Sequence, residues 1–253
     1  DPHCLEARRR QAEILGRLAR PEEASVEFLH IARQLAETGD LEQAQRSLEQ
    51  AYALPPEHRE EKLQLFREME EQLRRTTLQK RLGQAGRLLE DEQWEAAEHA
   101  YGLLLADYPD CVEAKLGLAR LKQRTGAEDD SRSLFLETAD GYRKEGHIRQ
   151  ATGVLQELLR LWPQQEQALE RLCELEESSG NLEEAGQLYL RLAEAREKAG
   201  RLDVAMEMCE KVLQREPDHL AARGRMAHLL ELLGRREEAY EHRQALAKAY
   251  HQE

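Results

Sequence analysis

The chain has 253 residues, of which 40% are hydrophobic and 34% charged, and its formal net charge at pH 7 is −13. This acidic balance argues against a nucleic-acid partner, because nucleic-acid-binding surfaces collect Lys and Arg. No apolar run approaches the roughly 20 residues that cross a bilayer, so we expect no membrane insertion.

Glu, Leu, Ala, Arg and Gln dominate the composition, and these residues favour helices, so the sequence predicts an all-α protein. Gly and Pro stand where the helical patterns end. Pro21 suits a first helical turn, Gly39 a helix end and Asp40 an N-cap. The expected helices, in chain order, are 3–19, 22–38, 41–54 (ending at Pro55 and Pro56), 57–74, 77–90, 93–107, 110–125, 129–145, 148–162, 164–179, 182–199, 202–216, 218–233 and 236–250.

One pattern returns four times, over 39–56, 92–109, 146–163 and 200–217, at steps of 53, 54 and 54 residues. A fixed period of this kind is typical of a helical repeat protein. The glycines at 126, 146, 180, 200 and 234 indicate three helices in each 54-residue unit. We therefore expect one array over 1–253, with a partial repeat at 1–21, full units at 22–74, 75–127, 128–181 and 182–235, and a terminal helix at 236–253.

Small and large residues recur in phase through these units. The first copy has Ala32, Gly39, Ala44, Leu48, Ala51 and Pro56, and the third has Ala139, Gly146, Ala151, Leu155, Leu158 and Pro163. This order resembles the tetratricopeptide repeat (TPR) family. The resemblance implies an α-solenoid of stacked hairpins, about 13–14 helices in a right-handed superhelix, with a concave groove for protein ligands. Ordinary TPRs repeat every 34 residues, so the 54-residue unit departs from the family pattern.

Sequence signatures of catalysis are missing. The chain has no phosphate-binding loop, no GxSxG and no HExxH motif, and its nine histidines are scattered. Cys4, Cys111, Cys173 and Cys209 lie far apart without a CxxC pair, as expected for reduced thiols in a cytoplasmic protein. We expect no enzyme activity, no cofactor and no metal site.

Surface residues therefore carry the functional prediction. The helices that would line a TPR groove repeat a leucine, at Leu29, Leu82, Leu136 and Leu190. Each leucine belongs either to the core or to an apolar strip for a partner helix. Neighbouring groove positions hold Arg33, Asp140 and Glu194 where carboxylate-binding TPRs carry Lys and Asn, so binding of an EEVD-type tail is not expected. Arg143 and the turn residue Trp162 complete the candidate partner-binding set.

The predicted function is a non-catalytic scaffold or adaptor that presents an extended helical groove to a protein or peptide. The alternative is a regulatory or self-assembly module of a larger multidomain protein, which binds a small ligand or controls a neighbouring domain. The chain begins without Met, which favours a processed product or a fragment. Its terminal repeats are a possible route to self-association.

Overall fold

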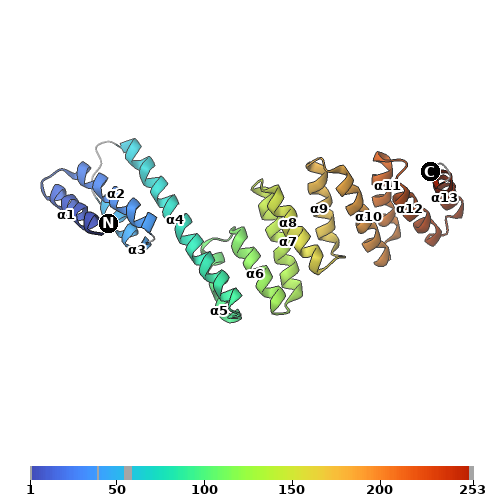
Figure 1. Ribbon diagram of the computed structural model, residues 1–253, viewed down its shortest axis with the longest axis horizontal. Helices are drawn as coiled ribbons and strands as arrows, with labels where there is room; N and C mark the ends of the chain where they lie inside the picture. The colour runs from blue at the N-terminus through green and yellow to red at the C-terminus, as the bar shows by residue number, and fades with distance from the viewer. Residues whose placement is uncertain (1, 39, 54–58, 251–253) are drawn as a thin grey trace. The chain divides into compact units, whose positions relative to one another are not determined.

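The computed structural model describes residues 2–38, 40–53 and 59–250, and this part of the chain forms α-helices joined by short turns (Figure 1). All-α architecture is thereby confirmed. The described residues contain thirteen helices: α1 (Pro2–Arg17), α2 (Pro21–Thr38), α3 (Leu41–Tyr52), α4 (Arg59–Glu90), α5 (Trp94–Asp107), α6 (Val112–Arg124), α7 (Glu128–Lys144), α8 (Ile148–Leu161), α9 (Glu166–Ser178), α10 (Leu182–Lys198), α11 (Leu202–Arg215), α12 (Leu220–Leu232) and α13 (Arg236–Tyr250).

Helix α4 corrects the sequence prediction. The helices expected at 57–74 and 77–90 are one helix of 32 residues. Residues 59–82 contain neither Gly nor Pro, so nothing in the sequence breaks the backbone there. The Thr76 hydroxyl donates to the Gln72 carbonyl at 2.8 Å, a bond that a threonine inside a helix can form. The unit boundary expected between residues 74 and 75 therefore lies inside α4.

Local capping signals agree with the structure where it describes them. Asp40 caps α3, and its carboxylate accepts a hydrogen bond from the Gln43 amide at 3.3 Å. Pro21 begins α2, where its missing N–H leaves no helical hydrogen bond unmade. The expected breakers Gly39, Pro55 and Pro56 lie outside the described residues.

Two compact units make up the chain. The N-terminal unit is Asp1–Asp107, with α1 to α5, and the C-terminal unit is Tyr108–Glu253, with α6 to α13. In the C-terminal unit each helix packs against the one before it in chain order (Figure 1). Helices α7, α8 and α9 have 17, 14 and 13 residues, and α10, α11 and α12 repeat these lengths.

Each unit encloses its own hydrophobic core. The aromatic residues expected inside are buried, with exposed fractions of 6% for Phe28, 0% for Phe135 and 4% for Tyr189. Small residues stand beside them, and Ala32, Ala139 and Ala193 are at most 2% exposed. These alanines let neighbouring helices approach closely, so the cores form between helices and not within any single helix.

Left-handed backbone conformations mark the turns. Five glycines have φ between +75° and +83°: Gly126, Gly146, Gly180, Gly200 and Gly234. Ala19 and Glu92 also have positive φ, of 56° and 58°. Glu92 stands where later copies of the repeat have Gly146 and Gly200. A side chain is strained in this region, whereas glycine adopts it freely.

We expect Glu92→Gly to stabilise the N-terminal unit. The substitution removes left-handed strain at the end of α4 and should raise the free energy of unfolding by about 0.5–1 kcal/mol. Chemical denaturation followed by circular dichroism measures the change. Glu90→Gly, two residues earlier at the last residue of α4, is the matched control and should not stabilise the protein. A loss of stability in Glu92→Gly would contradict the assigned turn.

Candidate functional site

The leucine column divides between core and surface. Leu29 and Leu136 are only 3% and 6% exposed and belong to the two hydrophobic cores. Neighbouring helices cover these two side chains, as the core alternative of the prediction has it. Leu82 and Leu190 are half-buried, and Leu190 packs against the C-terminal core. An unbroken apolar strip along the four leucines is not formed.

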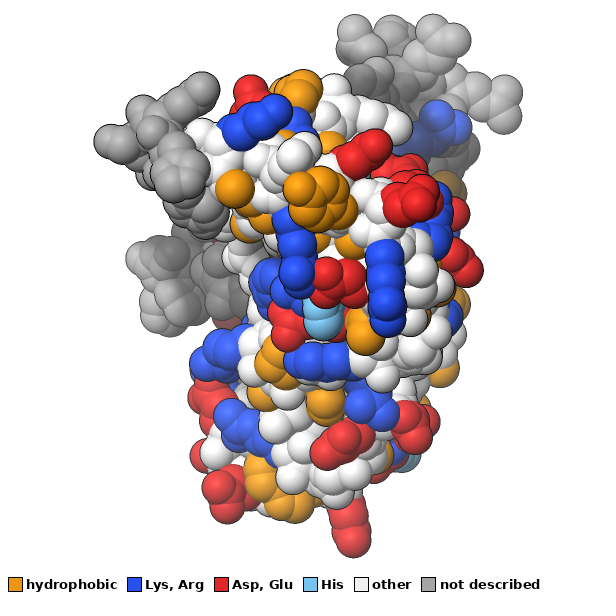
Figure 2. Space-filling model, turned by 90° about the vertical axis from the view of Figure 1, so that its right-hand side faces the viewer, with side chains coloured by type: hydrophobic (Ala, Val, Ile, Leu, Met, Phe, Trp, Pro, Cys, Tyr) orange, Lys and Arg blue, Asp and Glu red, His pale blue; other side chains and the backbone are white. Residues whose placement is uncertain are grey.

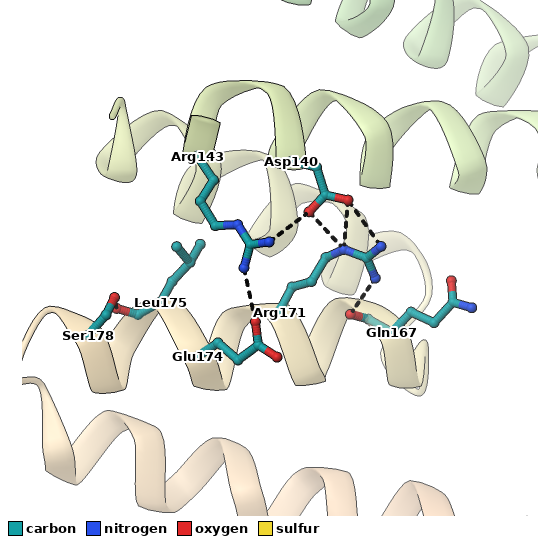
Figure 3. A network of polar contacts seen from close by, with 7 residues as sticks. All are labelled: Asp140, Arg143, Gln167, Arg171, Glu174, Leu175 and Ser178. Carbon is teal, nitrogen blue, oxygen red and sulfur yellow. Dashed lines mark hydrogen bonds and ion pairs between the residues drawn. The ribbon is translucent and has the colours of Figure 1, made fainter. Parts of the chain in front are cut away.

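Charged groups bridge α7 and α9 beside this column (Figure 3). Arg171 on α9 donates from Nε to Asp140 Oδ1 at 3.0 Å and from Nη2 to Asp140 Oδ2 at 3.1 Å. Arg143 on α7 donates to Glu174 Oε2 at 3.0 Å. Both helices place their charged residues three positions apart, so the two ion pairs form side by side. The structure thus brings the predicted Asp140 and Arg143 together, with 4.0 Å between Oδ1 and Nη2.

The same arrangement joins α10 to α12. Glu194 lies 2.8 Å from Lys198 Nζ and 3.6 Å from Arg225 Nη2. The hydrogen bond from Lys198 is the main cause that lowers the pKa of Glu194. Arg225 also donates to Glu197 at 2.9 Å, and His228 contacts the same carboxylate at 3.1 Å. Glu194 thus corresponds to Asp140 as an acid that holds an arginine two helices further on.

Arg196 connects α10 with α9 through a separate set of ion pairs. Its side chain is only 10% exposed, and its guanidinium contacts Glu170 and Glu166. Glu166 also pairs with Arg201, at the start of α11. Charged side chains thus link α7 to α9, α9 to α10, and α10 to α12. We call this surface, defined by Asp140, Arg143, Arg171, Glu174, Glu194, Glu197, Arg225 and His228, the ion-pair face.

The remaining candidates lie elsewhere. Arg33 is exposed in the N-terminal unit, and its side chain lies 3.7 Å from Glu37 of the same helix. Trp162 is half-buried after α8, and its Nε1 donates to Glu128 at 3.2 Å. The Arg132 guanidinium lies 5.4 Å from the ring centroid, within the range of a cation–π contact. Trp162 therefore anchors its turn to α7.

Arg171, Glu174, Glu197 and Arg225 form half of the ion-pair face but were not singled out from the sequence. Their signal was present, because a basic residue stands at both 171 and 225 and an acidic one at both 140 and 194, each 54 residues apart. Paired charges three positions apart on two helices indicate a bridge only when the helices are known to be neighbours. Figure 2 shows the wider pattern, with basic and acidic side chains interleaved over the face in view.

Buried thiols are among the titratable groups with strongly raised pKa values. Burial raises the pKa of Cys173 and of Cys209 to about 12. Cys111 is also buried with a raised pKa. The side chain of Cys4 lies outside the described residues. A thiol that keeps its proton is a poor nucleophile and a poor metal ligand, so these cysteines are packing residues.

Stability should fall at alkaline pH because of these thiols. The unfolded thiols ionise near pH 8.5 and the folded ones near 12, so their contribution is complete below 8.5 and is lost as pH rises toward 12. At pH 10 we expect a loss of about 1–2 kcal/mol per thiol relative to pH 8. Urea unfolding of the wild type and of a Cys173→Ala/Cys209→Ala variant measures this. Equal pH slopes in the two proteins would contradict the burial of the thiols.

The described residues contain no group of three or more His, Cys, Asp or Glu side chains placed to hold a metal ion. Within the same residues, none of the helices has the length and apolar character of a membrane span. The ion-pair face itself consists of mutually neutralised charges.

Comparison with curated protein sequences gives no match. Among solved structures, MamA shares 17% identity at a TM-score of 0.32, over 68% of this chain and 91% of MamA. The TPR domain of P58(IPK) shares 17% identity at 0.26, over 98% of this chain and 84% of that one. PilF of Pseudomonas aeruginosa shares 18% identity at 0.32, over 68% and 75%.

Models of the tetratricopeptide repeat match three stretches, at 82–140, 136–198 and 196–253. Together they run from residue 82 to the end of the chain, which is more than half of it. Neighbouring matches meet inside α7 and α10, the helices that carry Asp140 and Glu194. The 54-residue period stays a prediction. The chain belongs to the tetratricopeptide repeat family.

Proposed function

We propose that this chain is a non-catalytic scaffold that binds another protein through the ion-pair face. Tetratricopeptide repeats generally mediate protein–protein interactions. The observation that carries the proposal is the chain of side-chain bridges across α7, α9, α10 and α12. These bridges place exposed charged groups on four helices, which are candidate contacts for a partner.

The ion-pair face keeps its charged groups within reach of a partner. The side chains of Arg143, Glu174 and His228 are 46%, 63% and 54% exposed, although each has an intramolecular contact. Exposed ion pairs contribute little to stability, of the order of 0–1 kcal/mol. A partner can therefore exchange them for its own charges at small cost. Such a contact gives specificity and a binding affinity that falls with salt.

Charge reversal at Arg143 tests the proposal. Full-length protein immobilised on beads should retain specific proteins from a cell lysate, above a bead control, and Arg143→Glu should reduce that retention severalfold. Arg149→Glu is the matched control, because it makes the same change of charge at an exposed arginine on α8. Arg149 itself forms no ion pair with the described residues. It should retain the partners as the wild type does.

A charge swap separates binding from stability. Arg143→Glu/Glu174→Arg restores an ion pair between α7 and α9 while it reverses both charges that the partner meets. We expect wild-type thermal stability and weak retention. Retention that recovers together with stability would assign Arg143 a purely structural role. If the wild type recovers no protein above the bead control, the scaffold proposal is contradicted.

A further inference from the structure

The N-terminal unit contains a hollow of about 660 Å³ among α1, α2 and α3. Its floor is formed by the buried residues Ile31, Leu35 and Ser47, and Arg9 and Gln34 stand beside them. Ligand pockets typically have volumes of about 300–1,000 Å³. The hollow is therefore large enough to receive a side chain or a small molecule.

Later copies of the repeat show which side chains occupy the position that corresponds to the hollow. Leu35 stands three residues after Ala32, as Tyr142 and Arg196 stand three residues after Ala139 and Ala193. The longer side chains of Tyr142 and Arg196 are 6% and 8% exposed as whole residues and fill their site between helices. Leucine is shorter than either, so the N-terminal unit leaves this site partly empty.

The surroundings of Tyr142 match the lining of the hollow. Burial raises the pKa of Tyr142, and Glu113 and Glu145 are the charged groups that add most to the rise. By the spacing of the repeat, Glu113 corresponds to Glu6 and Glu145 to Thr38, and both of these line the hollow. His147, whose ring centroid lies 6.3 Å from that of Tyr142, corresponds to Asp40, which also lines it. The hollow thus occupies the place of the tyrosine ring.

The surroundings of Arg196 are not reproduced. Glu166 and Glu170 hold its guanidinium, and they are the first and fifth residues of α9. Val112, the first residue of α6, corresponds in the repeat to Glu166 and to Leu5. By the same spacing, the residues at the hollow that stand in the places of Glu166 and Glu170 are Leu5 and Arg9. A cation placed in the hollow would find Leu5 and Arg9 at the positions of these two glutamates, and the carboxylates that line the hollow stand at other positions. An aromatic ring is the occupant that these residues favour.

We propose that the hollow binds an aromatic side chain, the phenol of a tyrosine, from a segment of a partner protein. Ile31 and Leu35 supply an apolar floor for the ring. Arg9 is half-buried and forms no ion pair with any residue that the structure describes, so its guanidinium is available to lie over a ring face. The inference rests on the proposed scaffold function and adds an anchor site on the other unit.

The test uses full-length protein with p-cresol, the isolated side chain of tyrosine, followed by ligand-observed NMR. Saturable binding is expected for the wild type. Leu35→Tyr should abolish it by filling the hollow from inside, as Tyr142 does. Arg9→Ala should weaken binding by roughly twofold to fivefold without disturbing the fold. Ile14→Tyr adds a tyrosine at a residue of α1 that is 54% exposed, and should bind p-cresol as the wild type does.

A reciprocal variant tests the comparison between units. Tyr142→Leu should open a corresponding hollow in the C-terminal unit, so that p-cresol gains a second site and raises the thermal midpoint more than in the wild type. No binding to the wild type, or equal binding to folded Leu35→Tyr and to the wild type, would overturn the proposal. Tighter binding of N-propylguanidinium, the arginine analogue, would overturn the choice of an aromatic ring. Because p-cresol needs no partner, these outcomes are independent of bead capture.

Discussion

Replacement of Phe135 by alanine is expected to destabilise the C-terminal unit more than any other single truncation proposed for this chain. Phe135 lies on α7, is 0% exposed and belongs to the larger core. Removal of a fully buried phenylalanine ring costs about 3–5 kcal/mol, through lost transfer free energy and the cavity left behind. Denaturant unfolding followed by circular dichroism measures the loss.

Arg243→Ala is the matched control for Phe135→Ala. Arg243 follows Ala239 by four residues, as Phe135 follows Ser131, so both occupy one position of the repeat. The Arg243 side chain is 60% exposed and pairs with Glu231 at 2.6 Å. Its truncation should change the free energy of unfolding by less than about 1 kcal/mol. Similar losses in the two variants would contradict the burial of Phe135.

Features that depend on a few neighbouring residues could be predicted from this sequence. The cap at Asp40 and the glycine turn at Gly146 depend on a few neighbouring residues, and both were predicted at their positions. The continuous α4 was also written in the sequence, since residues 59–82 contain no breaker. It was missed because the repeat pattern was extended across residues 74–77, where neither Gly nor Pro stands.

The packing of side chains between helices could not be predicted from the sequence. Leu29 and Leu190 share a repeat position, yet Leu29 is in the core and Leu190 is half-buried. The ion pair between Asp140 and Arg171 joins α7 to α9, which are separated in the chain by α8, so no local sequence pattern predicts it. Periodicity identifies faces of helices, whereas the choice between core and surface depends on which neighbour covers each face.

Gly141→Ala is expected to show the close packing of α6 on α7. A Cβ at residue 141 would overlap Cγ1 of Val112, the first residue of α6. Val112 is 3% exposed, and its β-branched side chain has little freedom to rotate away. The two helices must therefore separate, and we expect a loss of about 1–3 kcal/mol in the free energy of unfolding.

The sign of the effect distinguishes packing from helix propensity. Gly153 lies in α8, where an added Cβ would meet nothing within 4 Å, so Gly153→Ala should raise stability by up to about 1 kcal/mol. Val112→Ala should make Gly141→Ala tolerable, because it removes the overlapping methyl group. If Gly141→Ala also stabilised the protein, α6 and α7 would not approach at this glycine. Opposite signs at the two glycines would show that Gly141 is required for the contact and Gly153 is not.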